Sequence, residues 1–304
     1  MKNLPTTEER IWSVLAHLSA IAVGMGILLP VIGWSEQRRK SNYASFQCLQ
    51  ALGYQSLGYT VWLLTYLVLI IVLVAILTIS LGFMAEGNNV SGSIVGIGTG
   101  IFFFVIFGML GLYFLFPMIA AVACALGKDF RYPIMGNRLA RYLGFEASES
   151  GDERTWLIED HEDRWVAAMG HFSVIITIWG MIAPLAAWIL QGKRSLFLKF
   201  QSMQTLVYQA GVTIVFIGAG VIYMFGFFVF SVMTGFGRNM SALDSSVGIV
   251  GLVFLFGSML IALVIILFLP LFHILGQWAG YRVLKGDDYH YPILGKLVEE
   301  RIVK

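Results

Sequence analysis

Charged residues are scarce in this chain: they make up 12% of its 304 residues, and five long stretches contain none. A soluble domain carries about 25% charged residues, so few positions here are suited to face water. The uncharged stretches are residues 41–85, 87–127, 165–192, 200–237 and 245–281. Several exceed the roughly 20 apolar residues with which a helix crosses a bilayer. The sequence therefore predicts an all-α integral membrane protein, because a membrane barrel would alternate polar and apolar residues.

Cysteine, metal-ligand motifs and basic blocks are also missing. The two cysteines, Cys48 and Cys124, lie in or beside apolar stretches and suggest neither a disulfide framework nor a metal site. A net charge of +2 without a basic block argues against a nucleic-acid partner. No nucleophile–base pair or phosphate loop is present, and no charged residue lies deep in an apolar stretch, where proton-driven transporters usually keep one. We therefore expect no enzyme activity, no cofactor and no metal.

What the chain does contain is a second copy of itself. A shift of 154 residues places Arg10 on Arg164, His17 on His171 and Trp34 on Trp188. The two copies also end alike, with Asp129-Phe130-Arg131-Tyr132-Pro133-Ile134 matching Asp288-Tyr289-His290-Tyr291-Pro292-Ile293 at a shift of 159. Such internal repetition indicates a tandem duplication. We divide the chain into a first membrane repeat (1–143), an acidic hydrophilic linker (144–164) and a second membrane repeat (165–304).

Each repeat holds one apolar stretch that Gly and Pro interrupt, followed by two long uninterrupted ones. The interrupted stretches are 11–35 and 165–190, and the others are about 46–83, 98–126, 200–235 and 247–284. If the interrupted stretch crosses the membrane once, Lys and Arg divide 10 against 10 between the two sides. If it turns back, 19 of the 20 share one side and only Arg238 is opposite. Because Lys and Arg favour the cytoplasmic side, we predict a broken re-entrant helical hairpin plus two long transmembrane helices in each of two parallel repeats.

The hairpins are marked by the same polar and turn residues in both copies. These residues are His17, Ser19, Gly26, Pro30, His171, Ser173, Gly180 and Pro184. Each histidine is expected to hydrogen-bond its nearby serine or the neighbouring helix. The alternative is that the two equivalent imidazoles face each other across a pseudo-twofold axis and hold a b-type haem.

A stripe of amides and tyrosines follows each hairpin at helical spacing, so that its members share one face. The stripe consists of Gln47, Gln50, Tyr54, Gln55, Gln201, Gln204, Tyr208 and Gln209. Uncharged amides in a membrane are costly unless they are hydrogen-bonded. They either attach the hairpin to the next helix or line a cavity between the repeats.

Three further groups of polar or aromatic residues are candidate sites. Tyr132, Pro133, Tyr291 and Pro292 are predicted to be interface anchors, because tyrosine favours headgroup depth and proline ends a helix. Glu159 to Asp163 resembles a metal cluster by composition, but a charged helix start explains it better. His273 and Gln277, one turn apart, are expected to form a local hydrogen-bonded pair.

The motifs together suggest a family. Glu9-Arg10-x-Trp12, Ala16-His17-Leu18-Ser19, the Gly/Pro break, Trp34, the Phe-Gln stripe and Tyr132-Pro133 resemble small bacterial and archaeal membrane domains of unknown function. That family is similar in turn to the twenty-kilodalton membrane subunit of the chloroplast Tic import translocon, most closely over Phe197–Gln204. The second copy departs from the pattern at Val166, which replaces Trp12 of the first. The resemblance implies a compact helical module without known enzyme activity or cofactor.

These observations favour a non-enzymatic polytopic membrane protein, an accessory, assembly or translocon-like subunit that binds another membrane protein or lipid. We expect it in the cytoplasmic (inner) membrane of a prokaryote, with termini and linker in the cytoplasm. The alternatives are a passive channel or small-solute transporter with a path between the repeats and, third, the haem-binding electron carrier.

Overall fold

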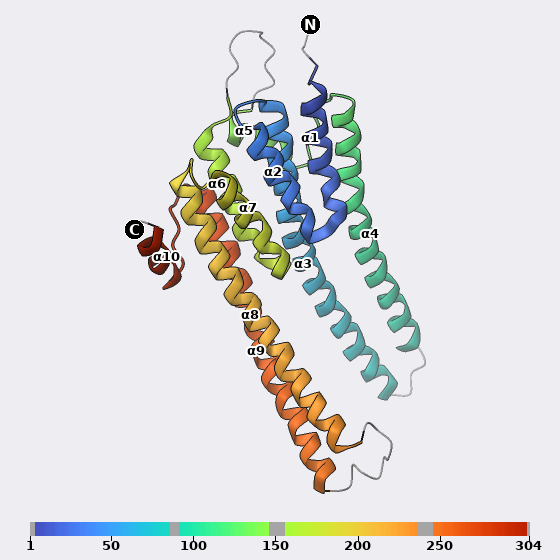
Figure 1. Ribbon diagram of the computed structural model, residues 1–304. Helices are drawn as coiled ribbons and strands as arrows, with labels where there is room; N and C mark the ends of the chain where they lie inside the picture. Colours follow the sequence, from blue (N-terminus) through green and yellow to red (C-terminus); the bar gives the residue numbers. More distant parts are fainter. Residues whose placement is uncertain (1–3, 86–90, 146–155, 236–245, 303–304) are drawn as a thin grey trace.

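The computed structural model describes residues 4–85, 91–145, 156–235 and 246–302, and every regular element within these ranges is a helix. Each repeat contributes a broken helical pair, two long helices and one short closing helix (Figure 1). By length and composition, six described segments are apolar enough to cross a membrane. The predicted all-α membrane architecture of two tandem repeats is thus confirmed.

The first hairpin consists of α1 (Thr7–Leu18), the 3-10 segment η1 (Ser19–Ile27) and α2 (Leu28–Gln37). Its two arms run in opposite directions (Figure 1). The amide of Gln37, at the end of α2, donates to a Glu8 carboxylate oxygen at the start of α1 over 3.0 Å. The segment Thr7–Gln37 is long enough to span a membrane, but it returns to the end where it began. The second hairpin repeats this order in α6 (Glu159–Phe172), η2 (Ser173–Met181) and α7 (Ile182–Gln191).

The reversal is made by a backbone conformation that L-residues rarely adopt. Val23 has φ 52° and ψ −130°, and its equivalent Thr177 has φ 53° and ψ −122°. Gly26 follows at a point of close approach, where an added Cβ would lie 1.9 Å from the Ser19 carbonyl oxygen. Pro30 then falls in the first turn of α2, where a proline leaves no intrahelical bond unmade.

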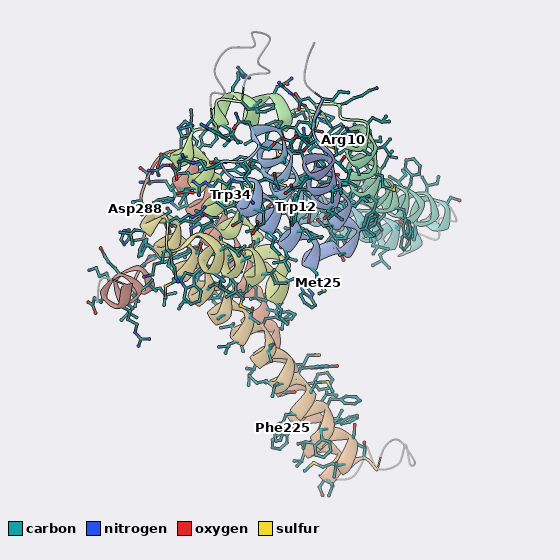
Figure 2. All side chains as sticks on the ribbon, turned by 45° about the horizontal axis from the view of Figure 1, so that its top comes forward. Arg10, Trp12, Met25, Trp34, Phe225 and Asp288 are labelled. Atoms are coloured by element: carbon teal, nitrogen blue, oxygen red, sulfur yellow. The ribbon has the colours of Figure 1, made fainter. Side chains whose placement is uncertain are left out.

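The long helices are α3 (Asn42–Ala85) and α4 (Ser91–Ala125) in the first repeat, and α8 (Leu196–Met233) and α9 (Ser246–Leu284) in the second. The 44 residues of α3 correspond to about 66 Å at a rise of about 1.5 Å per residue. The hydrocarbon core of a bilayer measures only about 30 Å. The beginnings of α3 and α8 and the ends of α4 and α9 therefore pack beside the hairpins, while the rest of each helix extends away as an arm (Figure 1). Figure 2 shows Phe225 on the α8 arm, far from Trp34 in the compact part.

Short amphipathic helices close the repeats: α5 (Met135–Leu143) after α4, and α10 (Leu294–Ile302) after α9. Of the predicted linker, residues 146–155 lie outside the described residues, as does Arg238. Glu159 already begins α6, so the last part of the acidic stretch is the first turn of the second hairpin. The linker's Ile158 amide donates to the Leu143 carbonyl, which fixes this end of it to α5.

The repeats meet along their hairpins and along the beginning of α3, which packs against α6. One continuous core contains Trp34, Phe46 and Leu49 from the first repeat and Trp165 and Met169 from the second. The boundary between the two repeats is called the seam below. Across it, the Trp165 indole donates to the Leu49 carbonyl over 2.9 Å. A glycine is needed in the first hairpin turn, because a Cβ on Gly24 would lie 2.6 Å from the Ile176 side chain. The seam is therefore part of a single folded body.

Candidate functional site

His17 is the centre of the polar network in the first repeat. It is fully buried on α1. Its Nε2 lies 3.0 Å from the Gln47 Oε1 on α3, and its Nδ1 lies 3.0 Å from the Tyr132 hydroxyl in the segment after α4. Because the amide oxygen only accepts, Nε2 carries the proton and Nδ1 accepts from the tyrosine. Both ring nitrogens are therefore used inside the repeat.

Gln47 and Gln50 hold the segment that follows α4. The Gln47 amide nitrogen donates to the Asp129 carboxylate and to the Phe130 carbonyl, each over 3.0 Å. The Gln50 amide donates to the same Phe130 carbonyl over 2.9 Å, and its oxygen accepts from the Tyr132 amide over 2.8 Å. Burial raises the pKa of Asp129, although Arg131 and the bond from Gln47 counteract the shift. The two amides thus supply partners to a buried, irregular piece of backbone.

Gln55 performs the corresponding task at the hairpin. Its amide nitrogen donates to the Ala16 carbonyl over 3.2 Å and to the Ser19 hydroxyl over 3.0 Å. The Ser19 hydroxyl itself donates to the Ala16 carbonyl. Backbone groups freed where α1 ends are thereby satisfied, and the hairpin is attached to α3.

Tyr54 completes the stripe on the other side. Its ring stacks on Tyr132 with centroids 4.2 Å apart, and its hydroxyl donates to the Tyr113 carbonyl over 3.1 Å. That carbonyl has no helical donor four residues on, because Pro117 stands there and lacks an N–H. Tyr54 therefore joins α3 to α4 at the point where the α4 ladder is interrupted.

The second repeat reproduces this network. The His171 nitrogens lie 3.0 Å from the Tyr291 hydroxyl and 3.1 Å from the Gln201 oxygen. Gln201 and Gln204 donate to the Tyr289 carbonyl, and Gln204 accepts from the Tyr291 amide. Gln209 donates to the Gly170 carbonyl and to Ser173, and Tyr208 stacks on Tyr291 at 4.1 Å. One partner is new: the Thr205 hydroxyl lies 2.9 Å from the His171 Nδ1.

These contacts change two expectations. The predicted anchors Tyr132 and Tyr291 are only 3% and 2% exposed and face the histidines, so the tyrosines are corrected from headgroup anchors to internal ties. Pro133 and Pro292 beside them remain exposed. Each histidine bonds a glutamine of the neighbouring long helix, which was one of the two expected partners, and not its nearby serine. Neither imidazole has a nitrogen left for a haem iron. The structure gives the glutamines buried, bonded positions within their own repeats.

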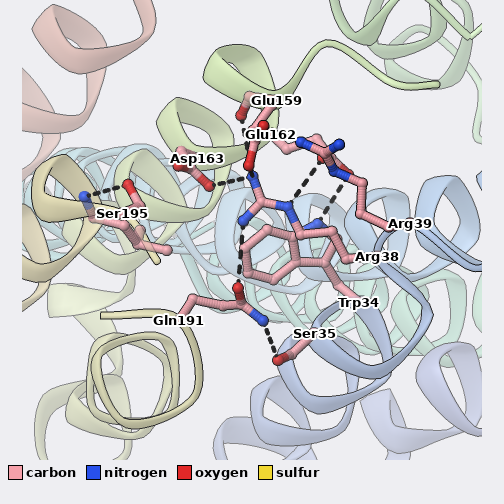
Figure 3. Close-up of polar contacts among 10 residues, drawn as sticks. Trp34, Ser35, Arg38, Arg39, Glu159, Glu162, Asp163, Gln191 and Ser195 are labelled. Atoms are coloured by element: carbon pink, nitrogen blue, oxygen red, sulfur yellow. Dashed lines mark hydrogen bonds and ion pairs between the residues drawn. The ribbon is translucent and has the colours of Figure 1, made fainter. Parts of the chain in front are cut away.

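A second polar cluster lies between the repeats, where Arg38 at the end of α2 is 4% exposed (Figure 3). Its guanidinium lies 3.2 Å from Glu162 and 2.8 Å from Asp163, both buried at the start of α6. It also contacts Glu159 at 3.4 Å and the Gln191 oxygen at 3.5 Å. The Trp34 indole adds a donor to Glu162 over 3.0 Å. An arginine of one repeat is thus enclosed by carboxylates of the other.

Nothing in the sequence pattern singled out this cluster. Arg38 stands in the run Glu36 to Lys40, and its partners stand in the acidic run Glu159 to Asp163, and each run alone is typical of a solvated surface. A difference between the two copies could have indicated the cluster. The residue equivalent to Arg38 is Gly192, whereas Glu162 and Asp163 match Glu8 and Glu9.

The remaining candidates are the acidic run at the start of α6 and the pair His273 and Gln277. Among the described residues, no group of three or more possible ligands could hold a metal ion. His161 stacks on Tyr142 with centroids 4.4 Å apart. Gln277 does not pair with His273 as predicted: it bonds the Thr60 hydroxyl of the first repeat over 3.1 Å and the Phe172 carbonyl over 3.0 Å. Within the described chain, the buried Nδ1 of His273 has no hydrogen-bond partner.

Fold and site together define a polytopic α-helical membrane protein built from two fused copies of one module. Each module is closed by its own histidine–glutamine–tyrosine network. Comparison with known families gives the more particular assignment: residues 8–139 and 162–298 each match the MamF/MmsF model, described as the magnetosome magnetite crystal formation protein family. The chain belongs to this family. No curated protein and no solved structure matches it.

The two matched regions correspond to the two repeats, so the duplicated membrane domain read from the sequence is confirmed. The match lends no support to a likeness to the Tic subunit.

Proposed function

We propose that this chain is a non-enzymatic integral protein of the magnetosome membrane that acts in magnetite crystal formation as an accessory or assembly subunit. The observation that carries the proposal is the family match, which includes both repeats and nearly all of the described chain. The family description supplies the process, and the buried networks suggest the kind of role.

The buried polar side chains have structural partners. Gln47, Gln50, Gln201 and Gln204 are 0% exposed, and each bonds backbone or side chains of its own repeat. A path for a solute needs polar groups that face a lumen, and these amides do not provide one. Because the hydrogen bonds of these amides go to structural partners, the amides give no support to an enzyme activity either. A rigid, membrane-embedded support for other components fits the arrangement best.

The charge distribution supplies an orientation. With termini and linker on the basic, cytoplasmic side, the connections between α3 and α4 and between α8 and α9 face the vesicle interior. In sequence these connections contain few charges, namely Glu86, Arg238 and Asp244. Most of the charged surface is thus available to cytoplasmic partners.

The test is genetic and biochemical. Deleting the gene in its magnetosome-forming host should change the size or shape of the magnetite crystals seen by electron microscopy, and the wild-type chain should restore them. Stoichiometric partners should co-purify with the chain after mild detergent extraction. Crystals of unchanged size and shape in the deletion strain would contradict the proposal.

A liposome experiment separates the channel from the subunit. Reconstituted protein should give no solute flux above empty liposomes, and Gln50→Leu with Gln204→Leu should lower thermal stability without altering permeability. Flux that drops in this double variant would favour the channel instead.

A further inference from the structure

Each repeat contains a strained, exposed isoleucine directly after its Tyr-Pro pair. Ile134 has φ 67° and ψ −51°, and the Met135 amide donates back to the Pro133 carbonyl over 2.7 Å. Ile293 has φ 68°, and the Leu294 amide donates to the Pro292 carbonyl over 2.8 Å. These are γ-turns of the positive-φ type, which are rare and strained. A β-branched residue in such a conformation is a genuine outlier.

The turn leaves an apolar side chain exposed in each repeat. Ile134 is 82% exposed and Ile293 is 78% exposed, although both are followed at once by a helix that buries its other face. Glycine would adopt the same turn without strain. Strained residues that persist point to a role for the side chain, and the duplication preserved isoleucine in both copies.

In the first repeat the isoleucine heads a basic stripe. Arg138 and Arg141 are three residues apart and share one face of α5, and Ile134 directly precedes the first residue of that helix. Both arginines are exposed, whereas Leu139, Ala140 and Leu143 pack inward. Residues 131–145 contain no acidic side chain. The stripe therefore has a positive face with an apolar end.

The stripe is also oriented along the membrane normal defined by α3. Its start lies beside Gly53, where an added Cβ would be 3.2 Å from the Met135 sulfur. Its far end lies beside Phe46, which stacks on Phe145 with centroids 4.2 Å apart. Since α3 begins at Asn42 on the basic side and then enters the apolar region, Ile134 is the deepest member of the stripe. Arg138 and Arg141 lie nearer the aqueous side.

We propose that this face of α5, formed by Ile134, Arg138 and Arg141, binds the headgroups of anionic phospholipids. Ile134 inserts at the boundary between headgroups and acyl chains, and the two guanidinium groups contact the phosphates above it. The apolar side chain lies toward the acyl chains and the basic side chains lie toward the anionic headgroups, which is the order of these layers in a membrane. Guanidinium groups suit phosphate oxygens because they donate in a planar fork.

The second repeat supplies an internal control. The equivalent stripe on α10 runs from Ile293 to Leu297 and Glu300, so it keeps the apolar end but has an acidic residue in place of Arg141. We expect α10 to contact lipid without preference for anionic headgroups. The proposal concerns the membrane around the protein and does not depend on a role in crystal formation.

Hydrogen exchange of the full-length protein in nanodiscs tests this assignment. Amides of residues 131–145 should exchange more slowly when phosphatidylglycerol is added to phosphatidylcholine, and residues 290–302 should respond equally to both lipids. Each basic residue near an anionic surface contributes about fivefold in affinity. Arg138→Ala should therefore raise the phosphatidylglycerol fraction needed for half-protection about fivefold, and Arg138→Ala with Arg141→Ala should abolish the lipid response. Lys296→Ala with Arg301→Ala is the matched control and should leave the α5 response unchanged.

Ile134→Gly separates lipid contact from folding. The glycine relieves the backbone strain, so the melting temperature should hold or rise while half-protection shifts to more phosphatidylglycerol. A lower melting temperature with an unchanged lipid response would mean that Ile134 serves the fold, and would overturn insertion. Protection that is equal in pure phosphatidylcholine, that survives loss of both arginines, or that inorganic phosphate reproduces would overturn the headgroup assignment.

Discussion

The Nδ1 atom of His17 lies 3.0 Å from the hydroxyl of Tyr132, although 115 residues separate the two in the chain. His171 and Tyr291 repeat the contact at the same distance. The bond ties the first helix of each repeat to its closing segment. Each repeat is therefore a closed unit, and the seam joins two units that already hold themselves together.

Removing the tyrosine hydroxyl should affect the two repeats unequally. Tyr132→Phe leaves the buried His17 Nδ1 without a partner, which should cost about 1–3 kcal/mol of stability. Tyr291→Phe should cost less, because the Thr205 hydroxyl also reaches the His171 Nδ1. Thermal unfolding in detergent measures both. Tyr223→Phe, at an exposed position on α8, is the neutral control. Thr205→Ala combined with Tyr291→Phe should lose as much stability as Tyr132→Phe does. Equal losses of stability in Tyr132→Phe and Tyr291→Phe alone would contradict this account.

Neutralising Arg38 should weaken the seam strongly. Arg38→Gln leaves the buried Glu162 and Asp163 facing each other without a cation, and breaking a buried pair typically costs about 3–5 kcal/mol. Arg39→Gln is the matched control, since the Arg39 side chain is 55% exposed and surface pairs are worth about 0–1 kcal/mol. The melting temperature in detergent should fall only for the first variant.

The same cluster allows a rescue experiment. Glu162→Gln with Asp163→Asn in the Arg38→Gln background removes the uncompensated charge and should recover part of the lost stability. Failure of this triple variant to exceed Arg38→Gln would mean that packing, rather than charge, makes Arg38 important.

The reversal in each hairpin contains strain that glycine should release. Val23→Gly should raise the stability by about 0.5–2 kcal/mol, because a strained φ costs about 1–3 kcal/mol. The gain is smaller than this cost because glycine also increases the conformational entropy of the unfolded chain. Thr177→Gly should behave alike, and thermal unfolding measures both changes. Gly26→Ala is the contrasting variant and should destabilise, because its Cβ would meet the Ser19 carbonyl. A lower melting temperature for both glycine variants would show that the turn is not strained.

The re-entrant hairpin makes a prediction about sidedness. Cysteines introduced at Lys2 and Arg39 should be labelled from the same compartment, whereas one at Asn88 should be labelled from the opposite compartment. The native Cys48 and Cys124 are buried and should react little. Opposite labelling of positions 2 and 39 would exclude the hairpin as the arrangement in the membrane.

The fold was predictable because its signals are repeated and local. The shift of 154 residues gave the duplication, and the Gly/Pro break with the distribution of Lys and Arg gave the hairpin. The glutamine stripe predicts hydrogen bonds to the hairpin, and Gln55 and Gln209 make them directly, while the Gln47 and Gln201 oxygens bond the hairpin histidines. Gln47 and Gln50 bond a segment some 80 residues away, which helical spacing does not reveal. The Tyr132 side chain turns inward instead of facing lipid, because average depth preferences do not show that a histidine needs its hydroxyl.

The charged seam escaped prediction for a related reason. A repeat is recognised by what its copies share, whereas Arg38 matters where they differ. Its equivalent, Gly192, carries no charge, so matching the copies drew attention away from it.

The one-sided seam also has a bearing on ancestry. Glu8 and Glu9 occupy in the first repeat the places of Glu162 and Asp163, so a first repeat standing in the position of the second would still present two carboxylates to Arg38. A second repeat standing in the position of the first would face the same two carboxylates with Gly192 in place of Arg38. An unfused copy of the first half therefore carries both the arginine and the acids of this contact, whereas an unfused copy of the second half carries the acids alone.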